Sequence, residues 1–126
     1  MSACTGTFTS TKADANRTPN EDVFEVVATF ACVSADTTAT ISIPYNGILI
    51  PVIYKTPDTS NNNLTSTLTI SDNAGNEVFS SGSGIAENTT SSYEMFKPLS
   101  GTITVLITFN EAVGVSATFT VYLRGI

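Results

Sequence analysis

The feature that most restricts the fold is a repeated two-residue alternation between apolar and threonine side chains. In residues 64–71 the large apolar residues occupy even positions and the threonines occupy odd ones. The same alternation returns in residues 101–109 and 115–123. Because successive side chains of a β-strand point to opposite faces, this pattern predicts strands with one buried face. An amphipathic helix would instead need an apolar repeat of about 3.6 residues.

Strands are also expected earlier in the chain. In residues 24–32 the even positions are apolar, and Val27 makes the other parity partly apolar. Residues 39–43 alternate cleanly and precede Pro44-Tyr45-Asn46-Gly47, in which Asn-Gly favours a tight turn. We therefore predict an all-β fold, an antiparallel β-sandwich or jelly roll of about 7–8 strands. Parallel pairing is not expected, because no crossover helix separates the strands.

Residues 48–54 are apolar on both parities and contain Pro51. Proline cannot donate a ladder hydrogen bond, so this segment is expected to be an edge strand, a bulge or a strand break. Its second apolar face, which includes Leu49 and Ile53, needs a cover. The segment therefore suggests contact with another subunit.

The first 20 residues differ from the rest. Phe8 is the one large apolar residue between Thr5 and Asn20, among threonine, serine and charged side chains. We predict an extended N-terminal arm in residues 1–20 and a β-sandwich domain in residues 21–126. Such an arm is either a frayed terminus or a tether that becomes ordered against a neighbour.

The charge balance excludes several functions. Eleven acidic residues oppose five basic ones, for a net charge of -6, and histidine is absent. This acidity argues against partners such as nucleic acid or an anionic membrane. The absence of histidine removes histidine-dependent triads and most zinc sites. We expect no enzyme, no cofactor, no metal and no small-molecule substrate.

The two cysteines, Cys4 and Cys32, allow one disulfide. The first residues lack the basic and apolar regions of a secretory signal, which predicts synthesis in a cytoplasm, where free thiols are favoured. Whether the two cysteines pair is left open. Cys32 lies in an apolar segment and is expected to be a small core residue.

Candidate chemistry is sparse in this sequence. Asp36, Asp58, Asp72 and Glu111 are typical turn residues. The oxygen-rich residues 72–77 lack the spacing of a calcium-binding loop and are expected to form a turn capped by glycine. Sugar binding through exposed aromatic rings is a rival function, although such tyrosines are also common at sandwich rims. The candidates for sugar binding are Tyr45, Tyr54, Tyr93 and Tyr122.

The chain contains 21 threonines. In the strands predicted from the clearest alternation, threonine occupies the outward positions where charged residues would be expected. Solitary proteins protect exposed sheets with charged side chains, whereas interfaces are depleted of charge. The threonines therefore suggest a subunit that packs against other subunits. The alternative explanation is that threonine, being β-branched, simply favours strands.

The second half of the chain carries a resemblance to a known family. The segments are residues 68–79 (LTISDNAGNEVF), 82–88 (GSGIAEN), 98–105 (PLSGTITV) and 120–126 (TVYLRGI). Their order of strands, Asp-x-x-Gly turn, Gly-rich loop and Pro-Leu-x-Gly resembles small virion proteins of tailed bacteriophages. The resemblance covers about residues 64–126, and its motifs are turn signatures.

The resemblance implies a head decoration (cement) protein that stabilises the outside of the capsid. Its implied partners are the major capsid protein and copies of itself, as a homotrimer, and its place is the virion surface after synthesis in the host cytoplasm. Two alternatives stay open: a tail or fibre module that binds carbohydrate or another receptor, and a neck or tail structural subunit. The candidate assembly contacts are Phe8, Ile48, Leu49, Ile53, Tyr54, Tyr122 and Ile126.

Overall fold

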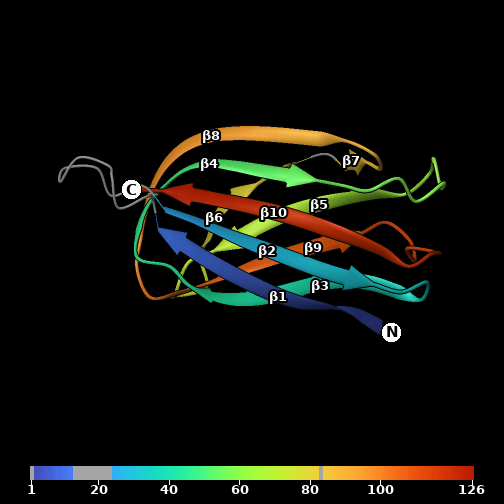
Figure 1. Ribbon diagram of the computed structural model, residues 1–126, viewed down its shortest axis with the longest axis horizontal. Helices are drawn as coiled ribbons and strands as arrows, with labels where there is room; N and C mark the ends of the chain where they lie inside the picture. Colours follow the sequence, from blue (N-terminus) through green and yellow to red (C-terminus); the bar gives the residue numbers. More distant parts are fainter. Residues whose placement is uncertain (1, 13–23, 83) are drawn as a thin grey trace.

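The computed structural model describes residues 2–12, 24–82 and 84–126, and these residues are all-β, as predicted (Figure 1). No helix among them is long and apolar enough to cross a membrane. They form the strands β1 (Ser2–Lys12), β2 (Phe24–Cys32), β3 (Asp36–Pro44), β4 (Gly47–Lys55), β5 (Thr65–Ser71), β6 (Glu77–Ser80), β7 (Ile85–Ala86), β8 (Thr90–Leu99), β9 (Thr102–Phe109) and β10 (Ala117–Gly125).

The strands form two layers that share β1 (Figure 1). The first layer, which we call the β10 sheet, has the order β1-β2-β10-β4-β8 and is antiparallel throughout. The second, the β9 sheet, has the order β3-β9-β5-β6. Residues 2–4 of β1 pair with β3, and residues 5–12 pair with β2. β1 therefore joins the two sheets on one side, while β6 and β8 are separate edges.

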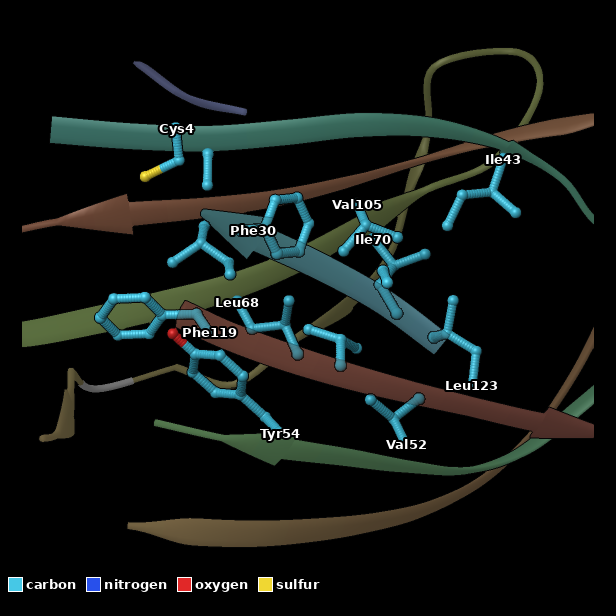
Figure 2. Close-up of a cluster of buried hydrophobic side chains, with 14 of the residues drawn as sticks. Cys4, Phe30, Ile43, Val52, Tyr54, Leu68, Ile70, Val105, Phe119 and Leu123 are labelled. Atoms are coloured by element: carbon cyan, nitrogen blue, oxygen red, sulfur yellow. The ribbon is translucent and has the colours of Figure 1, made fainter. Parts of the chain in front are cut away.

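The core lies between the two sheets and follows the predicted alternation. β9 contributes Ile103, Val105 and Ile107, and β10 contributes Phe119, Val121 and Leu123, all of them buried. Figure 2 shows that Phe30, Tyr54, Leu68 and Phe119, from four different strands, point into the same interior. Fully burying one such side chain contributes roughly 1.5–3 kcal/mol, so this interior dominates the stability of the fold.

Pro51 lies at a β-bulge, which is one of the three outcomes expected for residues 48–54. The register of β4 against β8 shifts between Leu49 and Pro51, while β4 itself lies between β10 and β8 and is no edge. Because of the bulge, odd-numbered residues of β4 face inward before Pro51 and even-numbered residues face inward after it. Leu49 before it and both Val52 and Tyr54 after it are fully buried.

Residues 2–12 correct the predicted N-terminal arm. They form β1, whose first three residues pair with β3 and whose remaining residues pair with β2, rather than an unpaired extension of the domain. The predicted boundary between residues 20 and 21 lies outside the described residues. β1 and the two-residue β7 also raise the strand number above the predicted 7–8.

The prediction that all strands are antiparallel is wrong at one place, the short parallel pairing of β1 with β3. β1 is antiparallel to β2, and the chain reverses between β2 and β3. β1 and β3 therefore run in the same direction without a crossover helix, because β2 itself brings the chain back.

Cys4 and Cys32 form a disulfide, with an S–S distance of 1.99 Å and a Cα–Cα distance of 4.3 Å. The expectation of free thiols is therefore wrong. The β1–β2 register pairs Thr5 with Ala31, so its continuation by one residue places Cys4 opposite Cys32. The prediction that Cys32 is a core residue is confirmed.

Candidate functional site

Two of the predicted contact residues, Tyr122 and Ile53, lie side by side on the outer surface of the β10 sheet, which we call the β10 face. Phe119, Val121 and Leu123 of β10 are buried, so the residues between them, Thr120 and Tyr122, point outward. Strand register places Thr29 of β2 beside Thr120 and Thr7 of β1 beside Thr29. Three neighbouring strands thus present a row of threonines to the outside.

The next row of the β10 face is apolar at its centre. Tyr122 pairs with Val27 on one side and with Ile53 on the other, and Thr9 follows Val27 on β1. Val27, Tyr122 and Ile53 are each only partly accessible. The β10 face therefore has an apolar centre with threonines beside it.

Charge on the β10 face lies toward its ends. At one end the Arg124 Nε donates to Glu25 Oε2 at 2.6 Å, so the two opposite charges form an ion pair. At the other end Lys55 is exposed beside Thr120. The apolar row between these positions contains no ionisable group other than the Tyr122 phenol.

The outer surface of the β9 sheet, the β9 face, is also uncharged at its centre but has a different composition. Register aligns its outward positions in three rows, each running from β3 through β9 to β5. The rows are Thr38–Thr108–Thr67, Thr40–Leu106–Thr69 and Ser42–Thr104–Ser71. This face offers hydroxyl groups and one leucine, with no aromatic residue among these positions.

Some of the predicted contact residues lie side by side at the surface of the structure, and others are buried in its core. Ile53 and Tyr122 are neighbours on the β10 face. Ile48 and Ile126 exchange main-chain hydrogen bonds of 2.8 and 3.2 Å at the end of the same sheet, and Ile126 is 45% exposed. Phe8 lies apart from both pairs, on β1, and is 38% exposed.

Leu49 and Tyr54 are corrections, because both are fully buried and no partner can reach them on the folded chain. Their inward orientation follows from the bulge at Pro51, which the apolar pattern of residues 48–54 does not locate. Val27 is an apolar residue of the β10 face that the prediction leaves out. The sequence feature that could have indicated it is the apolar residue at an odd position of β2, the parity that faces outward.

The tyrosines proposed for sugar stacking are mostly inaccessible. Tyr45 and Tyr54 are buried, and burial raises the pKa of both phenols well above the ordinary value. Tyr93 packs against Phe79, with ring centroids 5.0 Å apart. Of these four tyrosines, Tyr122 is the one on an outer sheet face.

Several carboxylates have structural partners. Glu87 accepts hydrogen bonds from the Thr59 backbone N–H and hydroxyl group at 2.8 and 3.3 Å, and Glu111 accepts one from Asn61 at 2.8 Å. Asp72 Oδ1 accepts the N–H groups of Ala74 and Asn76 at 2.9 and 2.8 Å. These bonds, the one from Asn76 foremost, hold the pKa of Asp72 below its usual value.

The geometry around Asp72 is the predicted turn, with Gly75 at a φ of 89°. Beside the turn lies an open hollow of about 310 Å³. It is lined by Asp72, Asn73, Ala74, Val78, Pro98, Leu99 and Ser100. Asp72 Oδ1 in this lining already accepts hydrogen bonds from the turn.

One cluster could hold a metal by residue type. The ligand atoms of Cys4, Cys32 and Asp36 lie within 4.8 Å of one another, and all three residues are buried. Asp36, expected to be only a turn residue, is 1% exposed, and its Oδ2 accepts the Val33 N–H at 2.8 Å. With the sulfurs joined in a disulfide, thiolate ligands are not available in this oxidised form.

No protein-family model and no curated protein matches the chain. Among solved structures, it is similar to the Yersinia pseudotuberculosis-derived mitogen at 14% identity, over 81% of this chain and 86% of that one, with a TM-score of 0.47. It is also similar to the module TmCBM61, solved with β-1,4-galactotriose, at 11% identity, 93% and 86% coverage and a TM-score of 0.45. A structure of infectious bursal disease virus, Gx strain, has 14% identity, 90% and 36% coverage and a TM-score of 0.40. At these identities and scores the similarities carry no argument about binding or assembly.

Proposed function

We propose that the protein is a non-enzymatic structural protein of a tailed-bacteriophage virion, which binds the outside of the capsid and stabilises it. The observation that supports this most is the β10 face, where the apolar row Val27, Tyr122 and Ile53 lies beside neutral threonines. The resemblance of residues 64–126 to small virion proteins of tailed bacteriophages supplies the phage context.

The composition of the β10 face suits association between proteins. Interfaces are depleted of charge and enriched in aromatic residues at their centre, as at Tyr122. The threonines offer methyl groups for packing and hydroxyl groups for hydrogen bonds, and covering them removes no charge from water. Both sheet faces are uncharged at their centres, and of the two the β10 face is the one with an aromatic residue there.

The proposed partner is the major capsid protein, with further contacts between copies of this chain in a homotrimer. A protein that binds the assembled shell, and not its separated subunits, shifts the equilibrium toward the intact shell. The negative charge of the chain suits the outside of a particle better than its nucleic-acid interior. The proposed function requires no cofactor.

Co-sedimentation with expanded capsids that lack the protein tests this function. We expect the wild-type chain to pellet with the capsids, and we expect Tyr122→Lys to weaken binding roughly 30-fold or more, the effect of losing a central contact. The matched control is Thr104→Lys, an outward position of the β9 face, which should change binding by less than about threefold. Circular dichroism of both variants verifies that they are folded.

Failure of the wild-type chain to bind capsids at micromolar concentration would contradict the decoration function. Equal losses in Tyr122→Lys and Thr104→Lys would contradict the assignment of the β10 face. Binding to host cells without binding to capsids would support the receptor-binding alternative, and Tyr122→Lys would then show whether the same face is used.

A further inference from the structure

Three strands meet at the corner where β1 passes from one sheet to the other. Cys4 lies on β1, Cys32 ends β2, and Asp36 begins β3. Their ligand atoms lie within 4.8 Å of one another, although Asp36 is 32 residues from Cys4 in the sequence. Each is at most 7% exposed. Two sulfurs and a carboxylate are thus gathered at a buried place where main-chain pairing holds all three strands.

The residue types suit a soft divalent cation once the disulfide is reduced. Thiolates select ions such as Zn²⁺, and a carboxylate is a common additional zinc ligand. Directly opposite residues of an antiparallel pair have Cβ atoms about 4.5–5.5 Å apart. The Cα atoms of Cys4 and Cys32 lie 4.3 Å apart, and rotation of the two reduced side chains would bring both sulfurs within the roughly 2.3 Å of a Zn–S bond from one ion.

The carboxylate of Asp36 is held in place by its surroundings. The Val33 N–H donates to Oδ2 at 2.8 Å, and the Asp36 N–H donates to the Val33 carbonyl at 3.0 Å. The Val113 N–H donates to the Asp36 carbonyl at 3.0 Å. Hydrogen bonds of this kind orient metal ligands and raise affinity. The position of the carboxylate beside the two sulfurs is therefore part of the fold.

We propose that Cys4, Cys32 and Asp36 form a redox-controlled site for one thiophilic divalent cation of the Zn²⁺ class. A thiol or phosphine reductant supplies two electrons, the S–S bond breaks, and two thiols form. Binding of the cation to both sulfurs releases the two thiol protons, and Asp36 supplies the third ligand. Water or a main-chain oxygen completes four-coordination. Oxidation by a disulfide oxidant expels the cation and restores the S–S bond.

Both forms of the site tie β1 to the domain, each in a different redox environment. A disulfide persists in oxidising surroundings, whereas thiols and metal sites belong to reducing ones. The cation would hold Cys4 against Cys32 where the disulfide is absent. We therefore expect Zn²⁺ to stabilise the reduced protein and to leave the oxidised protein unchanged.

Titration calorimetry with Zn²⁺ on the full chain tests the site. One sample stays oxidised, and the other is reduced with a phosphine under argon and then desalted. We expect the reduced protein to bind one Zn²⁺ per chain at least about 100-fold more tightly than the oxidised protein. With Co²⁺ as the probe, thiolate-to-metal charge-transfer absorption should appear in the reduced sample alone.

The variants separate the three ligands. Asp36→Asn keeps the shape of the side chain and should weaken Zn²⁺ binding at least about tenfold. Cys4→Ser should remove most of the Co²⁺ charge-transfer absorption. Asp58→Asn, in the loop after β4, is the matched control and should bind as the wild type does.

Equal Zn²⁺ affinity of the reduced and oxidised chains would overturn the proposal. Unchanged affinity in Asp36→Asn would overturn the role of the carboxylate, and a stoichiometry of one cation per two chains would overturn the site within one chain. If Cys4→Ser fails to fold, the comparison of wild type with Asp36→Asn still decides the result, since both keep the disulfide before reduction.

Discussion

The two sides of the sandwich join its sheets by different means. On the β1 side the connection is made by main-chain pairing and a covalent bond, since β1 pairs with both β2 and β3 and Cys4 is bonded to Cys32. On the opposite side, β6 and β8 are separate sheet edges, and side chains bridge the gap near them. The Phe79 and Tyr93 rings pack 5.0 Å apart, and the Tyr54 and Ser66 hydroxyl groups are 2.7 Å apart.

This difference shows how a polar segment can become part of the domain. β1 contributes one large apolar residue, Phe8, and that side chain remains partly exposed. Its place depends on backbone hydrogen bonds, which any non-proline sequence can make, and on one disulfide. The β6–β8 side depends on the identity of a few side chains. The two sides should therefore respond to different substitutions.

Removing the disulfide should have the largest effect. Replacing both Cys4 and Cys32 with alanine should lower the free energy of unfolding by about 3–4 kcal/mol, because a cross-link between residues 28 apart restricts the unfolded chain. Urea denaturation in the presence of a chelator, without reductant, measures the loss. Wild-type protein that has been reduced should lose a similar amount. A loss below about 1 kcal/mol would show that main-chain pairing alone holds β1.

The second prediction concerns the hydrogen bond on the opposite side. Ser66→Ala should lower the free energy of unfolding by about 1–3 kcal/mol, because the fully buried Tyr54 hydroxyl loses its partner. Adding Tyr54→Phe to Ser66→Ala should recover part of this loss, since no polar group then remains unpaired. Ser42→Ala, on the β9 face, is the control and should cost less than about 0.5 kcal/mol.

A double variant as unstable as the sum of the two single variants would contradict this account. It would mean that packing around Tyr54, rather than the hydrogen bond, joins the sheets here. The disulfide variant and the Ser66→Ala variant should also be additive, because their sites lie on opposite sides of the sandwich.

The strands of the core could be predicted because their pattern is local. Alternation in β5, β9 and β10 gives both the strand and its buried face. β1 could not be predicted in this way. Its pairing partners are set by the whole topology, and the positions on its core-side parity hold Cys4, Gly6 and Phe8 rather than a run of aliphatic residues. The exact alternation of Thr5, Thr7 and Thr9 was the available signal.

The candidate surface could be predicted only in part, for a related reason. Tyr122 follows from the alternation of β10, but the neighbours Val27 and Ile53 depend on register, which is not local. In β4 the bulge at Pro51 shifts the inward parity, so the apolar pattern alone could not separate outward Ile53 from buried Tyr54. The cluster of Cys4, Cys32 and Asp36 likewise depends on how three strands meet.

The smallest expected effect is a loss of stability at alkaline pH. Burial raises the pKa of Tyr54 above its ordinary value, while the same phenol in the unfolded chain ionises near pH 10. Above that pH the unfolded state binds fewer protons than the folded state, so stability falls as pH rises. The loss should be about 0.4 kcal/mol per buried tyrosine at pH 10, and close to zero below about pH 9.

Urea denaturation from about pH 8 to about pH 10.5 measures this loss, and Tyr54→Phe isolates one tyrosine. The variant should be less stable at every pH, because Ser66 loses its partner, but its stability should fall less steeply with pH. Tyr45→Phe should reduce the slope in the same direction, since burial also raises the pKa of Tyr45. Parallel curves for wild type and Tyr54→Phe would mean that the phenol of Tyr54 reaches water before the chain unfolds.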